Sequence, residues 1–154
     1  MEIKQLNRIP NLDQYKKLSR VYTQSDILLA MLREKNLPEE VVEDINIAVD
    51  QINVTTGSEK EVLKQVRSAQ SSILKLLEKK LKLVPKNYYR NLWMALGMAA
   101  IGLPIGVAFG AILGNMGLLA LGISIGMVIG LIIGVKLDRK AFVEGKQLDI
   151  EIKY

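Results

Sequence analysis

The side chains most capable of chemistry in this sequence are a group of carboxylates between residues 39 and 50. The group comprises Glu39, Glu40, Glu43, Asp44 and Asp50, with no basic residue among them. Clustered carboxylates can bind a cation or a basic partner. A solvated helix face is the preferred interpretation, and weak surface ion pairs with a following basic helix would suit it.

Most other kinds of catalytic or ligand-binding site are absent from the sequence. The chain has no cysteine and no histidine, which excludes disulfides, thiol chemistry, common zinc sites and imidazole-based triads. Neither Gly-x-Gly-x-x-Gly nor Gly-Lys-Ser/Thr occurs, so no phosphate-binding loop is indicated. We therefore expect no catalytic, cofactor-binding or metal-binding residues, and no enzymatic activity.

Residues 92–135 contain no charged residue and ten of the twelve glycines. Two apolar runs, 92–113 and 117–135, would form helices of roughly 33 Å and 28 Å, enough to cross a hydrocarbon core of about 30 Å. Neither run leaves a polar face, which disfavours the core of a soluble protein. The pattern predicts two transmembrane helices joined by a tight loop at 114–117.

Glycine recurs at every fourth position in both runs. The first series is Gly102, Gly106, Gly110 and Gly114, and the second is Gly122, Gly126, Gly130 and Gly134. Rows of missing side chains let membrane helices approach closely. The two rows could face each other within one hairpin or face other copies, and Gly97, Ala100, Ala108, Ala111, Ala120 and Ser124 offer some small residues for a second face.

This series resembles the glycine-zipper hairpins of small, mostly uncharacterised bacterial membrane proteins. The resemblance covers residues 92–135 only and concerns helix packing, so it transfers no active-site residue. It implies a two-span protein, which we expect in the bacterial inner membrane.

Pro104 lies inside the first run, where it cannot donate to the carbonyl of Ala100 and should kink or loosen the helix. It is either a tolerated membrane proline or a hinge that shapes a channel wall. The runs lack the ionisable residues that usually mark transport sites. A coupled transporter is therefore disfavoured, whereas a passive pore built from many copies stays open.

Basic and aromatic residues flank the two apolar runs. The predicted interface residues, part of them in a linker at 85–91, are Lys79, Lys80, Lys82, Lys86, Tyr88, Tyr89, Arg90, Trp93, Lys136, Arg139 and Lys140. The positive-inside rule then places both termini in the cytoplasm. Basic residues beside a membrane segment favour anionic lipid headgroups as partners rather than nucleic acid.

Three amphipathic helices are predicted before the membrane segment, at 12–35, 38–54 and 58–83, with Asn11 as a cap of the first. Ser58 and Glu61 match a capping box at the start of the third. An antiparallel bundle over residues 1–84 is the simplest way to bury the three apolar stripes. A long coiled coil is less favoured because each pattern is short.

The C-terminal residues 136–154 are expected in the cytoplasm. The second apolar run should continue as helix to Glu144, with Gly145 as the stop. Residues 147–154 alternate apolar and polar side chains, which predicts a short strand. Its partner could be residues 1–6 or another protein, and a mobile tail is the alternative.

These features predict an all-α membrane protein with a cytosolic three-helix module and a two-helix transmembrane hairpin. Its expected function is that of a membrane-anchored interaction or scaffold module that self-associates through the glycine stripes and can bind a cytosolic protein. The alternative is an oligomeric pore or membrane-perturbing effector gated by the cytosolic helices.

Overall fold

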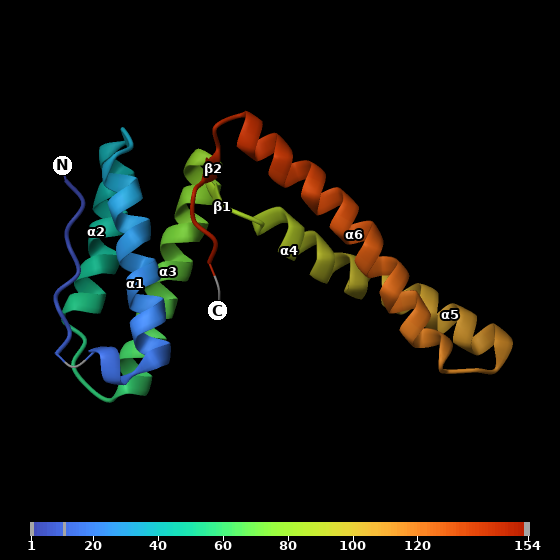
Figure 1. The fold of residues 1–154 in the computed structure, drawn as a ribbon. Helices are drawn as coiled ribbons and strands as arrows, with labels where there is room; N and C mark the ends of the chain where they lie inside the picture. Colours follow the sequence, from blue (N-terminus) through green and yellow to red (C-terminus); the bar gives the residue numbers. More distant parts are fainter. Residues whose placement is uncertain (1, 11, 153–154) are drawn as a thin grey trace. The chain divides into compact units, whose positions relative to one another are not determined.

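The computed structural model describes residues 2–10 and 12–152. The chain divides into two compact units: unit 1 is Met1–Val84 with Leu148–Tyr154, and unit 2 is Pro85–Gln147. Apart from one pair of two-residue strands, the regular elements of the described residues are helical (Figure 1). In chain order they are η1 Leu12–Gln14, α1 Lys16–Arg33, α2 Glu39–Asn53, α3 Glu59–Leu81, β1 Val84–Pro85, α4 Tyr88–Leu96, η2 Gly97–Gly102, α5 Leu103–Leu113, α6 Leu118–Val143 and β2 Gln147–Leu148.

The helix starts of unit 1 follow local signals in the sequence. The capping box at α3 is confirmed, because Ser58 Oγ accepts from the Glu61 amide while the Glu61 carboxylate accepts from the Ser58 amide. Helix α1 begins at Lys16, later than expected, after the 3-10 turn of η1. The three-and-four spacing of apolar residues predicts Tyr15 on the apolar face of this helix, but Tyr15 precedes the helix and is 41% exposed. The predicted cap Asn11 lies outside the described residues.

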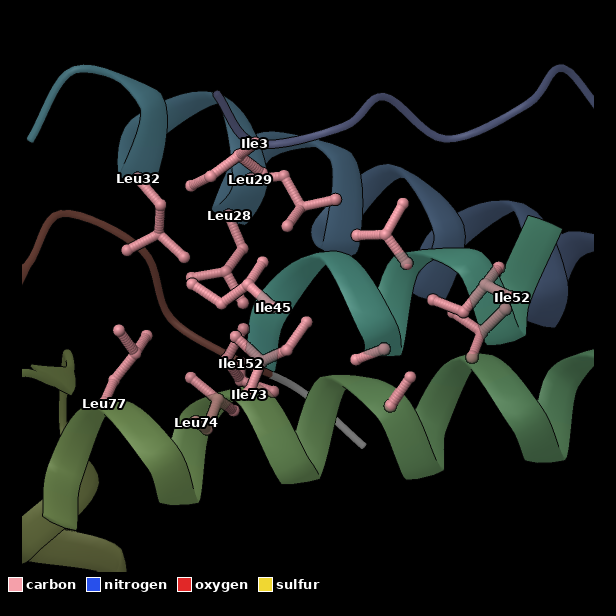
Figure 2. Close-up of a cluster of buried hydrophobic side chains, with 14 of the residues drawn as sticks. Ile3, Leu28, Leu29, Leu32, Ile45, Ile52, Ile73, Leu74, Leu77 and Ile152 are labelled. Carbon is pink, nitrogen blue, oxygen red and sulfur yellow. The ribbon is translucent and has the colours of Figure 1, made fainter. Parts of the chain in front are cut away.

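Helices α1 and α2 both pack on α3 and share one apolar core. Five of its side chains, labelled in Figure 2, are each less than a twentieth exposed: Leu28, Leu32, Ile45, Ile73 and Leu77. The core also contains side chains from outside the three helices. They are Ile3, Leu148, Ile150 and Ile152.

The C-terminal segment thus belongs to unit 1 and is not a separate tail. Strand β2 pairs with β1 and not with residues 1–6, one of the partners that the sequence allows. The strand predicted over 147–154 is only two residues long among the described residues. The apolar side chains of the alternating pattern are nevertheless buried at Leu148, Ile150 and Ile152. Helices offer no backbone edge for a ladder, so beyond β2 the side chains of Ile150 and Ile152 are buried without strand pairing. Residues 153 and 154 lie outside the described part.

Unit 2 is a helical hairpin. Helices α4, η2 and α5 form one continuous helix, Tyr88–Leu113, which packs along α6. The first helix starts four residues before the predicted boundary at 92, so four of the seven residues of the expected linker are helical. Helix α6 continues to Val143, and Gly145 follows with a φ of +68°, as the expected stop. Both helices are long and apolar enough to cross a membrane.

Candidate membrane-spanning hairpin

The outward surface of the hairpin is apolar. Only 22% of the apolar window of each helix is buried. The exposed side chains include Val107, Phe109, Ile112, Leu121, Val128 and Ile132, each at least half exposed. In water this surface would stay exposed and forgo roughly 25 cal/mol of burial free energy for each Å², whereas a hydrocarbon core would remove it from water.

The buried residues of α6 within its apolar run are all glycines. Gly122, Gly126, Gly130 and Gly134 are all buried. A Cβ atom added to Gly122 would lie 2.3 Å from the amide nitrogen of Gly106, and one added to Gly126 would lie 2.3 Å from the carbonyl oxygen of Gly97. The backbones of the two helices therefore meet where these side chains are missing.

The remaining two glycines of α6 meet α4. A Cβ atom at Gly130 would lie 2.0 Å from the carbonyl oxygen of Trp93, and one at Gly134 would lie 2.5 Å from the Cα of Arg90. These distances are far below van der Waals contact. The close approach thus extends along the hairpin as far as the first turn of α4.

The inward face of the first helix differs from the predicted series. Its buried glycines are Gly97, Gly102, Gly106 and Gly110. Gly97, expected on a second face, joins the same face because the six residues Gly97–Gly102 form a π-helix, whose turn is wider than that of an α-helix. Gly114 instead ends α5 with a φ of +64°, and an added Cβ there would meet nothing within 4 Å.

Pro104 explains the position of this π-turn. A proline ring has no N–H and clashes with the carbonyl four residues earlier. Immediately before it, the Leu103 amide donates to the carbonyl of Met98, five residues back. The wider turn gives room for the ring, and the Pro104 side chain itself faces outward. The π-turn thus accommodates the proline ring, and the helix continues from Tyr88 to Leu113.

Asp138 joins the two helices near the ends of the apolar runs. Its side chain is 8% exposed, and its two oxygens accept from the amides of Tyr89 and Arg90 at 3.0 Å and 2.9 Å. Asn87, the residue before α4, makes no side-chain cap bond. The carboxylate of α6 therefore caps α4, where the helix dipole favours negative charge. We did not predict this role, for which the only sequence signal is one acid among the basic residues after the second run.

The predicted interface residues fall in both units. Tyr88 and Tyr89 stack edge to face with ring centroids 5.2 Å apart. The remaining residues in unit 2 are Lys86, Arg90, Trp93, Lys136, Arg139 and Lys140, whereas Lys79, Lys80 and Lys82 belong to unit 1. Lys82 ends α3 in the left-handed conformation, with a φ of 57°.

Lys80 has partners inside unit 1. Its ammonium donates to Glu40 and lies 3.4 Å from Asp44 on α2. The hydrogen bond to Glu40 raises the pKa of Lys80 above its ordinary value. Two carboxylates of α2, Glu40 and Asp44, therefore form ion pairs within the bundle. No group of three possible metal ligands occurs in the part of the chain that the structure describes.

Comparison with protein-family models, with curated proteins and with solved structures finds no match for the chain.

Proposed function

We propose that the chain is a non-enzymatic, two-span integral membrane protein that presents unit 1 as an interaction or scaffold module in the cytoplasm. The observation behind this proposal is the distribution of side chains on the hairpin: the apolar side chains point outward, and the two helices contact each other through the backbone of their glycines. Soluble helix pairs have the opposite arrangement, with large apolar side chains between the helices.

Glycine-zipper packing closes the hairpin in this proposal. Buried glycines on both helices and the short distances at Gly122 and Gly126 support it. Because the two rows are then occupied by each other, the expected self-association would use the outward faces or unit 1.

The proposed orientation places both termini in the cytoplasm and the 114–117 loop outside. The chain has no cysteine, so a single introduced cysteine is its only thiol. Labelling of that thiol shows on which side of the membrane the residue lies. Met116→Cys and Lys60→Cys both replace exposed residues. A membrane-impermeant maleimide applied to intact spheroplasts should label residue 116 at once and residue 60 only after lysis. Equal labelling of both before lysis, or extraction of the chain by alkaline carbonate, would contradict the proposal.

The scaffold function is tested by native mass measurement in lipid nanodiscs and by crosslinking in the native membrane. A scaffold should give discrete homo-oligomers or a reproducible crosslinked partner, and a strictly monomeric chain without a partner would refute this function. The pore alternative predicts dye leakage from liposomes at high protein-to-lipid ratio. Ser124 is the one polar residue within the two apolar runs 92–113 and 117–135. In the structure its hydroxyl donates to the carbonyl of Ala120 in its own helix at 2.9 Å.

A further inference from the structure

Residues 2–9 lie extended beside α2 within unit 1 (Figure 1). Two asparagines of α2 bind their backbone. Asn46 accepts from the amide of Lys4 at 2.8 Å and donates to the carbonyl of Glu2 at 3.0 Å. Asn53, seven residues after Asn46, makes the same pair of hydrogen bonds to residues three positions further along the segment. It accepts from the amide of Asn7 at 2.8 Å and donates to the carbonyl of Gln5 at 2.9 Å.

The repeat follows from a match between two periods. Asn46 and Asn53 are two helical turns apart, which is about 10.5 Å along α2. Three residues of extended chain advance about 9–10 Å. Each two turns of helix therefore correspond to three residues of an extended segment that runs parallel to α2.

Two side chains of helix α1 also donate hydrogen bonds to the backbone of this segment. Arg33 donates through Nε to the carbonyl of Ile3 at 3.1 Å and through Nη2 to the carbonyl of Lys4 at 2.8 Å. The Tyr22 hydroxyl donates to the carbonyl of Asn7. We call Tyr22, Arg33, Asn46 and Asn53 the amide site, because together they bind main-chain groups and would accept many side-chain sequences.

The side chains of the segment supply a matching apolar pattern. Ile3, Leu6 and Ile9 are spaced by three residues, the same interval as the backbone contacts. Ile3 is buried in the core, and Leu6 and Ile9 pack against it. Lys4 adds one ion pair with Asp50 at 2.6 Å. The site thus selects an extended chain with an aliphatic side chain at every third position.

We propose that the amide site is a peptide-recognition surface whose partner is the N-terminal segment of a second copy of this chain. Residues 2–9 satisfy all of its contacts, and the same segment from a second copy offers identical atoms. The segments in cis and in trans therefore differ only in effective concentration. Exchange of the segment would link copies of the scaffold, so this inference deepens the proposed function and rests on it.

The first experiment uses the full chain in detergent and a fluorescent peptide of residues 2–10. Ile3→Asp with Leu6→Asp should release the resident segment and leave the amide site intact. If that segment fills the site at least about 90% of the time, peptide affinity should rise by at least about tenfold over the unsubstituted chain. Adding Asn53→Ala should remove this gain, whereas adding Val54→Ala at the neighbouring, 75% exposed position should not.

A folded double variant that binds the peptide no better than the unsubstituted chain, or binds a scrambled peptide equally well, would overturn the proposal. Should the double variant fail to fold, a photo-reactive residue at Leu6 of the otherwise unsubstituted chain tests it in nanodiscs. Covalent dimers should increase with the number of chains per disc and decrease with excess peptide. Crosslinks confined to one chain at every density would refute exchange, and membrane insertion, measured in the same discs, tests the proposed function separately.

Discussion

Gly126 is the position where one methyl group should separate the two helices of the hairpin. In Gly126→Ala the new Cβ would lie 2.3 Å from the carbonyl oxygen of Gly97, 2.5 Å from the amide nitrogen of Gly102 and 2.6 Å from its Cα. Carbon atoms pack at about 3.5–4.0 Å. All three neighbours are backbone atoms, so no side chain can move aside, and the helices must separate locally by about 1 Å or more.

The free-energy change follows from that separation. A gap of this size removes about a quarter to a half of the dispersion energy at each affected contact. Forced insertion of a methyl group into a packed interior costs about 1–3 kcal/mol. We therefore expect Gly126→Ala to lower the free energy of hairpin unfolding by about 2 kcal/mol.

Gly110→Ala is the matched control. It lies on the same inward face, but its added Cβ would meet its nearest neighbours, Asn115 O and Met116 Sδ, at 3.4 Å, close to ordinary contact. Both substitutions gain the same helix propensity, which cancels in the comparison. Taken alone, the control should leave stability unchanged or raise it by up to about 1 kcal/mol.

The assay is equilibrium unfolding in mixed micelles, together with pulsed electron paramagnetic resonance between spin labels on the two helices. Gly126→Ala should reduce stability and lengthen the interhelical distance, and Gly110→Ala should do neither. If the two variants were equally stable and equally spaced, the assignment of the glycine face to helix packing would be refuted.

Three further perturbations test other contacts. Leu148→Ala should destabilise unit 1 by about 2–5 kcal/mol in thermal unfolding, because Leu148 is 1% exposed; a mobile tail would show almost no change. Asp138→Ala should destabilise the hairpin by about 1 kcal/mol and speed hydrogen exchange at the amides it caps, whereas unchanged exchange would exclude the cap. The hydrogen bond from the Ser58 amide lowers the pKa of Glu61 below 4.5, so its stabilisation is present above pH 4.5 and is lost as the pH falls through the lowered value. Glu61→Gln should therefore flatten the decrease in melting temperature below pH 4.5, and an identical pH profile in the variant would contradict this role.

Much of the local structure of unit 1 could be predicted from its sequence. Three-and-four spacing of apolar residues indicates helices, and in α2 the residues that this spacing predicts to be buried are all buried: Val41, Ile45, Ala48 and Ile52. The Ser58–Glu61 capping box is local, since both partners lie within one turn. Tyr15 shows the limit of this reasoning, because periodicity does not mark where a 3-10 turn ends and the helix begins.

The contacts made across long sequence separations could not be predicted. Nothing local indicates that Asn46 binds residues 2–4, or that the carboxylate of Asp138 caps α4. The alternation after residue 147 predicts one buried face but not what covers it. In each case the partner is selected by how distant segments come together, which local propensity does not encode.

The sequence by itself determined that two uncharged apolar runs of membrane-spanning length carry glycine at every fourth position, because composition and spacing are properties of the chain alone. Only the tertiary structure decided which glycines meet. Gly97 joined the inward face and Gly114 left it, since the π-turn before Pro104 changes the helical phase and the loop takes Gly114 into a left-handed conformation. A four-residue spacing identifies a face of an ideal helix, but the face that is buried depends on the phase at which the partner backbone meets it.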